Sequence, residues 1–473
     1  MAKHTQRRTT LGVIVGTRGF FPTHFAHKGR TDILRILKEE GFDTVCLGPR
    51  EATGGAVENL ADARACGALL KKHADRIDGV LVTLPNFGDE KAVANSLKAS
   101  GLQVPILVHA WPDDPKQMTV ANRRDSFCGK MSVTNNLDQY AMPFSLTDLH
   151  TVDPESKPFR ADLARFGATC RVVRGLTSVR VGALGARTGP FNTVRYSEKI
   201  LEAHGISVET MDLSEAMGRA NQLKASEPAV RAKLRAICGY TDTQGIYPQG
   251  LDRMARLGVV IDRWMRDQDL AGTAIQCWTS MEQFYGIVPC ALMSMMSDAL
   301  LPSACEVDVG GLVGMLALRH ATQSPAALVD WNNNYGDDPN KCVFFHCSNL
   351  PKSLFKKAKM AIQEIIAGSV GPENACGSIV GRLAAGPITY ARVATDDTEG
   401  RIRAYVGEGR LTDDPLETFG GYGVVQIPNL QGLLRHICAE GFEHHVAIAK
   451  GEVARAIDDA FDAYLGYDVY RHA

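Results

Sequence analysis

Carboxylate and imidazole side chains in the second half of the chain stand beside apolar runs, where buried strands are expected to end. Glu306 lies in Cys-Glu-Val-Asp-Val-Gly-Gly, Asp330 follows Ala-Ala-Leu-Val, and His346 follows Cys-Val-Phe-Phe. The pair His444 and His445 precedes another apolar run, Val-Ala-Ile-Ala. Oxygen and nitrogen ligands without a thiolate favour Mn²⁺, Mg²⁺, Co²⁺ or Zn²⁺. These residues therefore predict a divalent-cation site.

Each of these residues also has an ordinary structural interpretation when it is taken alone. Asp330 at a strand end can cap a helix or bond a loop. Glu306 can pair with a buried arginine, and His346 can be a hydrogen-bonded core histidine. The joint pattern, in this order along the chain, favours a site over the separate interpretations.

A second group of polar residues is placed to contact a substrate. In open α/β sheets, ligands bind at the carboxyl ends of the strands. Gln276, Trp278 and Glu282 follow one apolar run, and Asn349 follows another. Trp278 suits either stacking on a sugar face or packing in the core. We expect Gln276, Trp278, Glu282 and Asn349, with His444, to hold sugar hydroxyls.

The composition is that of a globular protein. The chain has 473 residues, 45% hydrophobic and 22% charged, with a net charge of −1. Its length predicts two or three domains, and the absence of a basic excess argues against nucleic-acid and anionic-membrane partners. No apolar run is long enough for a membrane helix, and Leu-Gly-Val-Ile-Val-Gly is too short for a signal peptide, so a cytoplasmic protein is expected. The twelve cysteines form no Cys-x-x-Cys pair, which predicts small buried hydrophobes and no structural zinc cluster.

The first two thirds of the chain alternate strand-like and helix-like segments. This alternation predicts parallel sheets with helices on both faces. The expected strands are 11–16, 44–47, 79–84 and 104–108, and then, after a polar stretch at 148–158, 179–184, 207–210, 273–278 and 326–330. The expected helices include 32–40, 61–73, 214–234 and 251–269.

After about residue 340 the pattern changes to short β-like runs separated by Gly, Pro, Asp and Thr. Such a pattern is typical of an antiparallel sheet or small barrel. The expected strands are 342–346, 377–379, 388–394, 402–407 and 423–427, followed by a closing helix over 452–464. The domains are predicted as 1–170 (N-terminal α/β), 171–340 (central α/β, carrying the carboxylates) and 341–473 (β-barrel-like).

Several segments together resemble the L-fucose/L-arabinose isomerase superfamily. They are spread from one end of the chain to the other and fit a divergent L-fucose isomerase-like branch better than either named enzyme. The segments are Cys-Glu-Val-Asp-Val-Gly-Gly, Phe-His-Cys-Ser-Asn-Leu-Pro, Gly-Phe-Glu-His-His-Val, Gln276-Cys-Trp and, near the start, Gly-Val-Ile-Val-Gly-Thr-Arg-Gly-Phe-Phe-Pro.

The resemblance implies two Rossmann-like α/β domains followed by a C-terminal antiparallel β-barrel-type domain. It also implies an aldose–ketose isomerase with Mn²⁺ bound by Glu306, Asp330 and His445, and with His346 as a further ligand in the arabinose branch. His445 is preferred over His444 by similarity. Family members are trimers or hexamers, and Arg18 is the residue expected to reach a neighbouring subunit's site.

The implied reaction moves a proton between two neighbouring carbons of a sugar through an ene-diol. A divalent cation stabilises the negative charge on its oxygens, and Glu306 and Asp330 are the expected acid–base pair. The alternatives are a non-catalytic sugar-binding protein and a metal-dependent hydrolase or aldolase. The sequence leaves the sugar open, although Arg18 and the Arg123-Arg124 pair are compatible with a phosphorylated or sulfonated one.

Overall fold

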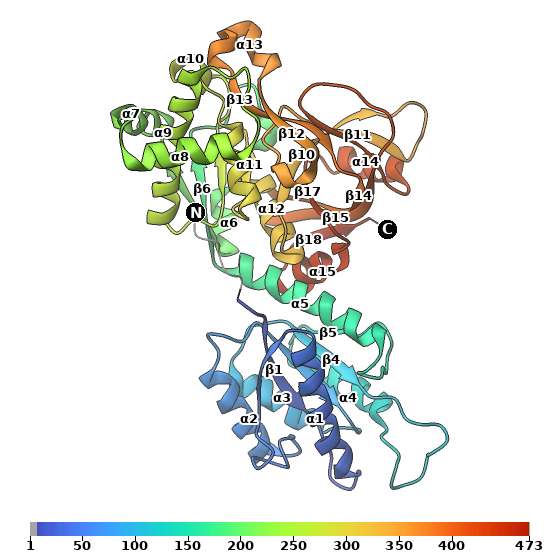
Figure 1. The fold of residues 1–473 in the computed structure, drawn as a ribbon. Coiled ribbons are helices and arrows are strands. Elements are labelled where there is room, and N and C mark those ends of the chain that lie inside the picture. The colour runs from blue at the N-terminus through green and yellow to red at the C-terminus, as the bar shows by residue number, and fades with distance from the viewer. Residues whose placement is uncertain (1–6, 473) are drawn as a thin grey trace. The chain divides into compact units, whose positions relative to one another are not determined.

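The computed structural model describes residues 7–472, which fold into two compact units (Figure 1). The N-terminal unit runs to Arg174 and includes Asp459–Leu465, and the main unit comprises Gly175–Asp458 and the residues from Gly466 on. Among residues 7–472, no helix combines the length and the apolar character needed to cross a bilayer. The domain boundaries expected at residues 170 and 340 are not tested by this division and stay a prediction.

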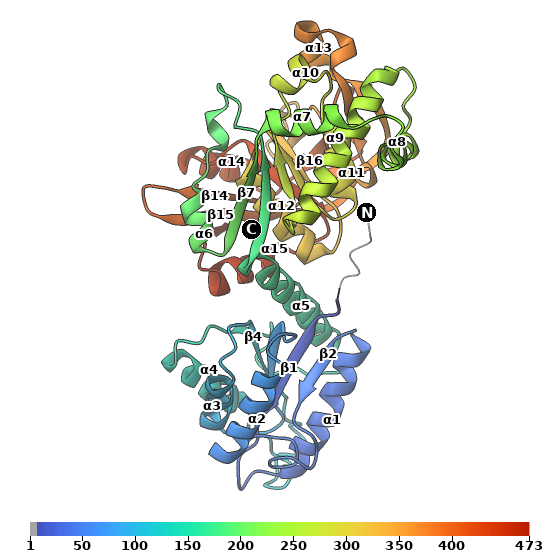
Figure 2. The ribbon, with the colours of Figure 1, turned by 90° about the vertical axis from the view of Figure 1, so that its left-hand side faces the viewer.

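The N-terminal unit is built on a parallel sheet of five strands in the order β2-β1-β3-β4-β5. Its central strands are buried throughout, as expected for a parallel sheet covered on both faces. Helices α1 and α5 pack on one face, and α2, α3 and α4 on the other (Figure 2). The elements are β1 Thr10–Val15, α1 Thr23–Glu39, β2 Asp43–Cys46, α2 Leu60–Lys72, β3 Gly79–Leu84, α3 Glu90–Ser100, β4 Ile106–Ala110, α4 Ser126–Gln139, β5 Ser145–Leu146 and α5 Lys157–Thr177.

The main unit begins with a second parallel sheet, β7-β6-β8-β9. The single helix expected over 214–234 is two helices, because Pro228 occupies the first turn of a new helix, a position that proline favours. The elements are β6 Val179–Leu184, α6 Glu198–Ala203, β7 Ile206–Met211, α7 Leu213–Gln222, α8 Pro228–Tyr240, α9 Pro248–Asp267, β8 Thr273–Ile275, α10 Ser280–Phe284, α11 Cys290–Asp298, β9 Ser303–Cys305 and α12 Val309–Thr322.

The C-terminal strands form a closed antiparallel barrel in the order β16-β11-β10-β17-β14-β15, with β15 pairing back to β16. The predicted fold class, two Rossmann-like α/β parts followed by an antiparallel barrel, is confirmed. The elements are β10 Ala326–Asn334, β11 Lys341–His346, β12 Phe355–Ile362, α13 Glu364–Val370, β13 Cys376–Leu383, β14 Gly386–Asp396, β15 Arg401–Thr412, β16 Gly421–Gln426, α14 Leu430–Ala439, β17 His445–Lys450, α15 Ala454–Asp459, a π-helical turn Ala460–Tyr464 and β18 Asp468–Arg471.

One strand belongs to a different sheet from the one expected. The sequence pattern predicts 326–330 as a strand of the central parallel sheet, but β10 pairs antiparallel with β11 and β17 in the barrel. Helix α12, which is apolar around nearly its whole circumference, packs against β10, β14 and β17. It buries one face of the barrel, so Ala-Ala-Leu-Val is as continuously apolar as a strand of a parallel sheet.

Candidate active site

Glu306 follows β9 directly, at the carboxyl end of the second parallel sheet. The backbone is left-handed at Glu306 (φ 57°) and at Val307 (φ 59°), and it turns the chain into α12. Asp308 caps that helix, because its carboxylate accepts a 2.8 Å hydrogen bond from the N–H of Gly311. A left-handed conformation in two consecutive non-glycine residues costs free energy and persists only where the surrounding structure holds it. The turn therefore fixes where the Glu306 carboxylate lies.

The barrel brings Asp330 and His445 to the same place. These two residues are directly opposite each other on β10 and β17, so their side chains share one face of the sheet. Nε2 of His445 lies 3.4 Å from Oδ1 of Asp330 and 3.4 Å from Oε2 of Glu306. His346, at the end of β11, places its own Nε2 3.9 Å from the same Glu306 oxygen. All four predicted ligand residues thus lie in one cluster.

The cluster has the donor set and the unsatisfied oxygen that a divalent cation requires. Oε2 of Glu306 is buried and accepts no hydrogen bond from the described residues, and leaving such an oxygen unpaired is costly. Glu306, His346 and His445 offer ligand atoms within 4.8 Å of one another, as do Asp330, His444 and His445. Nitrogen and carboxylate ligands in this number suit Mn²⁺, Co²⁺ or Zn²⁺. The residues present therefore fit the metal, while their roles as ligands stay a prediction.

A buried ion network orients His445. Nδ1 of its ring lies 2.8 Å from Oδ2 of Asp308, which leaves Nε2 for the cluster. Arg392 bonds both oxygens of Asp308 and, at 3.0 Å, Glu443. Burial opposes the ionisation of Asp308, but the charges of Arg392 and His445 outweigh it and hold the pKa of that carboxyl well below its usual range. A carboxylate behind a ligating histidine fixes the ring's tautomer and orientation.

The electrostatics of His445 follow from the carboxylates around it. Burial disfavours the charged ring, yet the hydrogen bond to Asp308 and the charges of Glu306, Asp308 and Asp330 raise the pKa of His445 to about 9. The surrounding carboxylates therefore favour a positive charge at Nε2 of His445. A divalent cation there would take the place of the proton.

The network behind the histidine was not predictable from the sequence pattern. A buried arginine is expected as an alternative partner of Glu306, but the buried Arg392 pairs with Asp308 instead. The available signals were Arg392 inside the apolar run Ile388–Ala394 and Glu443 immediately before the two histidines. Phe191 was not predicted either; its ring centroid lies 5.5 Å from that of His444 and 5.6 Å from that of His445.

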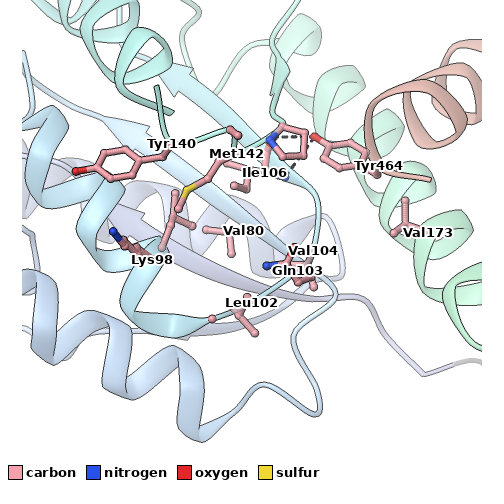
Figure 3. A pocket seen from close by; sticks show the side chains of 14 residues that line it. Val80, Lys98, Leu102, Gln103, Val104, Ile106, Tyr140, Met142, Val173 and Tyr464 are labelled. Carbon is pink, nitrogen blue, oxygen red and sulfur yellow. Dashed lines mark hydrogen bonds between the residues drawn. The ribbon is translucent and has the colours of Figure 1, made fainter. Parts of the chain in front are cut away.

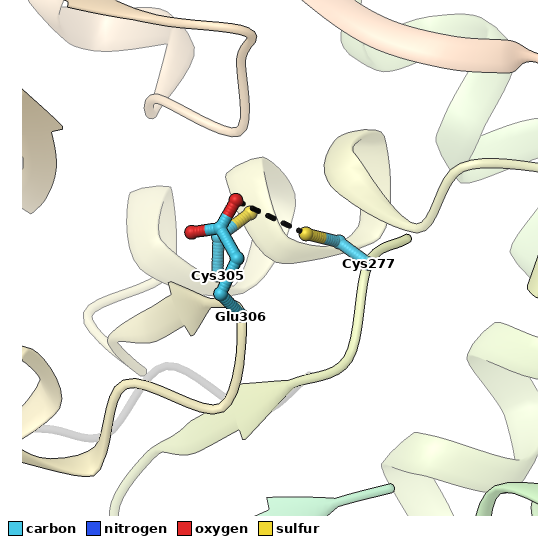
Figure 4. Close-up of side chains that lie close together, drawn as sticks. All are labelled: Cys277, Cys305 and Glu306. Carbon is cyan, nitrogen blue, oxygen red and sulfur yellow. Dashed lines mark hydrogen bonds between the residues drawn. The ribbon is translucent and has the colours of Figure 1, made fainter. Parts of the chain in front are cut away.

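Two buried cysteines, Cys277 and Cys305, which the sequence predicts to be small hydrophobes, lie close to Glu306 (Figure 4). Sγ of Cys277 donates to Oε1 of Glu306 over 3.6 Å, and Cys305 precedes the glutamate. Both thiols are buried, and burial raises the pKa of Cys277 to about 12. Cys277 is therefore a neutral donor to the carboxylate at neutral pH.

Two of the expected substrate residues have their polar groups occupied by the protein. Nε1 of Trp278 donates to Oε1 of Glu306 over 3.0 Å, so Trp278 holds the carboxylate. The side-chain oxygen of Gln276 accepts from the N–H of Ala186 over 3.0 Å, at the start of the loop after β6. Asn349 donates to the carbonyl of Ser303, and its own oxygen accepts no bond within the described chain.

Two further expected residues, His444 and Arg18, differ in exposure and in position. His444 is half-exposed, and its Nε2 lies 3.7 Å from Oδ1 of Asp330, at the open side of the cluster. Arg18 belongs to the N-terminal unit, where it pairs with Glu90 and donates to the carbonyl of Gly88 over 3.0 Å. Its expected role toward another subunit's site stays a prediction.

Glu282 is a buried carboxylate on α10 whose two oxygens find no hydrogen-bond partner among the described residues. Burial raises the pKa of Glu282 from 4.5 to about 8. The folded protein therefore keeps this proton to higher pH than the unfolded chain does. As a result, the free energy of unfolding is not reduced by Glu282 below pH 4.5, and it falls as the pH rises from there toward about 8.

We expect Glu282→Gln to remove this part of the pH dependence. The variant should exceed the wild type in free energy of unfolding by a margin that grows with pH, reaching on the order of 3–5 kcal/mol. Urea denaturation of both proteins at several pH values measures the margin. Parallel curves for the two proteins would show that Glu282 is ionised or paired in the folded state.

The N-terminal unit holds a cavity of about 280 Å³ beside β4 and the end of α3 (Figure 3). Lys98 is its one charged lining residue, and the hydroxyl of Tyr464 is bonded to Ser145. The cavity has neither a pair of acid–base groups nor a ligand cluster. The chemistry is therefore expected at Glu306, Asp330 and His445.

Comparison with known proteins matches two segments of the chain to sugar isomerase domains. Residues 12–177 match the N-terminal domain of fucose/sulfoquinovose isomerases, and residues 344–472 match the C-terminal domain of L-fucose isomerase. A sulfoquinovose isomerase of Priestia aryabhattai is 24% identical over 95% of this chain and 96% of its own. Those of Alkalicoccus urumqiensis (22%, covering 90% and 93%) and Clostridium sp. strain MSTE9 (25%, covering 70% and 73%) are also similar.

The α/β fold with its closed barrel, the two domain matches and the carboxylate–imidazole cluster together define an aldose–ketose isomerase. The chain belongs to the L-fucose isomerase-like family. Both the enzyme class and the family expected from the sequence are confirmed.

Proposed function

We propose that this isomerase interconverts an aldose and a ketose that carry an anionic group, with sulfoquinovose as the first candidate. The curated relatives that cover nearly the whole chain bear the name sulfoquinovose isomerase, which supports a sulfonated sugar as substrate. The single observation that carries the chemistry is the convergence of Glu306, Asp330 and two buried histidines on one point.

Glu306, Asp330, His445 and His346 are the proposed ligands of a divalent cation, with Mn²⁺ as the expected ion and Mg²⁺ or Co²⁺ as alternatives. When bound, the cation would act as a Lewis acid that stabilises the negative charge of the ene-diol oxygens. The support is the buried Oε2 of Glu306, which lies near two imidazole nitrogens and accepts no hydrogen bond from the described residues.

The two carboxylates are proposed to move the proton. Oε2 of Glu306 and Oδ1 of Asp330 each lie 3.4 Å from Nε2 of His445, so they flank a common point. A sugar held there has one carboxylate near each of two neighbouring carbons, as removal and return of a proton requires. Trp278 holds the other oxygen of Glu306, and Asp308 holds the ring of His445, so both groups are oriented before substrate binds.

Removal of the metal is expected to abolish activity. A preparation treated with a chelator should lose isomerisation of the sulfonated sugar and regain it with Mn²⁺, because the ene-diol charge is otherwise unstabilised. Metal analysis of each sample accompanies the assay, and re-addition of Ca²⁺, which prefers more oxygen ligands, is the control. Full activity in a sample shown to be metal-free would overturn the metal's proposed role.

The assembly and location expected from the sequence are carried as proposals. A homo-oligomer, a trimer or hexamer, is proposed because the family's active sites take an arginine from a neighbouring subunit, and Arg18 is the candidate. Light scattering gives the number of subunits. The Arg18→Gln variant should raise the KM without changing the number of subunits. The cytoplasmic location stays a prediction.

A further inference from the structure

The loop between β6 and α6, residues 185–197, touches the catalytic cluster. The hydroxyl of Thr188 donates to the carbonyl of Trp278 over 3.3 Å. The ring centroids of Phe191 and Trp278 lie 5.9 Å apart, and Phe191 also contacts both histidines of the pair. This loop therefore forms one wall of the site.

The same loop lines a neighbouring cavity of about 910 Å³. Val307, which follows Glu306, and Gly441, which lies shortly before the two histidines, also line it. The cavity thus shares its loop wall with the site and reaches Val307, the residue next to Glu306. A substrate held at the cluster is placed next to this space.

Three arginines and three carboxylates line the cavity, and three of these six residues are already paired. Arg403 lies 3.4 Å from Asp396 and 3.6 Å from Glu440. Glu198 is hydrogen-bonded to Tyr196. Asp397 is exposed in the turn between β14 and β15. The other two charged residues are Arg187 and Arg195.

Arg187 and Arg195 have no carboxylate partner among the described residues. Arg187 is half-buried, and its Nη1 donates to the carbonyls of Thr188 (3.1 Å) and Gly189 (3.3 Å), which hold the side chain to its own loop. Arg195 is exposed and makes no ion pair within the same residues. An arginine fixed in this way still presents the remaining donors of its planar fork, which match the oxygens of sulfonate, phosphate or carboxylate.

We propose that Arg187, assisted by Arg195, binds the anionic group of the substrate in this cavity and so sets the enzyme's preference for a charged sugar. The proposal rests on the proposed function. Both are specificity residues, since the cluster of Glu306 and His445 carries the chemistry.

The test compares Arg187→Gln, Arg195→Gln and the double variant with the wild type, on sulfoquinovose and on D-glucose. Loss of charge-assisted hydrogen bonds should raise the KM for the sulfonated sugar roughly 10- to 100-fold, with kcat nearly unchanged. The low kcat/KM for D-glucose should not fall, because it has no group for the arginines. Arg180→Gln, an exposed arginine paired with Glu209 on β6 and β7, is the matched control.

Sodium sulfate separates the two proposals, because its binding is measured by calorimetry without turnover. We expect weak binding to the wild type that is lost in Arg187→Gln. Sulfoquinovose turnover with an unchanged KM in the double variant overturns the arginine proposal alone. A wild type that isomerises neutral sugars only overturns the proposed substrate, and unaltered sulfate binding in the variants then overturns the arginine site as well.

Discussion

Glu306→Gln is expected to lower kcat by at least ~10³-fold, because it removes both an acid–base group and a charged ligand. The amide cannot accept a proton from carbon, and it leaves the Nε2 atoms of His346 and His445 without the anion they face. Bound metal should also fall. Steady-state kinetics with metal analysis of the purified protein measure both effects.

Folding is the control for that variant. The substitution keeps the shape of the side chain and the N–H donor of Trp278 still faces an oxygen or amide, so the circular dichroism spectrum and thermal transition should match those of the wild type. Glu364→Gln, in an exposed carboxylate at the start of α13, should leave activity unchanged. Full activity of Glu306→Gln with metal still bound would remove Glu306 from the mechanism.

Asp308→Ala is expected to cost about 3–5 kcal/mol in free energy of unfolding, because it leaves the fully buried Arg392 with one partner fewer. The N–H of Gly311 at the start of α12 loses its cap as well. His445 loses the bond that orients its ring, so metal affinity should fall by roughly 10- to 100-fold. Urea denaturation and metal titration measure the two losses separately.

A surface pair provides the contrast for that experiment. Asp252→Ala removes a partly exposed partner of Arg256 on α9 and should cost about 0.5 kcal/mol or less. Equal losses in the two variants would mean that the charge of Arg392 is reached by solvent. A stable Asp308→Ala with unchanged metal affinity would remove the positioning role of Asp308.

The sequence could predict many of the elements and the residues that cluster in the site, because each leaves a local pattern. Buried parallel strands are continuous apolar runs, and Glu306, Asp330, His346 and His445 each stand at the edge of one. The strand register then determines which of these residues meet. Asp330 lies opposite His445 because β10 pairs with β17. That pairing joins segments more than a hundred residues apart, so no local pattern reveals it.

The residues that were missed act through such distant contacts. From the sequence alone, Arg392 is expected to be a solvent-facing residue of a strand. The barrel instead buries it against Asp308 and Glu443. The basic residues are a second example. The sequence pointed to Arg123 and Arg124, but Arg124 lies over the rings of Phe25 and Trp111. Arg187 and Arg195 become candidate anion-binding residues only because the fold places them in the lining of one cavity.

The measurement that tests the account most directly is the reaction of the Mn²⁺-loaded protein with sulfoquinovose in D₂O, followed by NMR. Proton transfer through an ene-diol predicts the corresponding ketose, with deuterium at the carbon that receives the proton, and no product in Glu306→Gln. A ketose formed without deuterium would contradict the proton transfer by Glu306 and Asp330. Failure to form a ketose from this or any other aldose would contradict the isomerase itself.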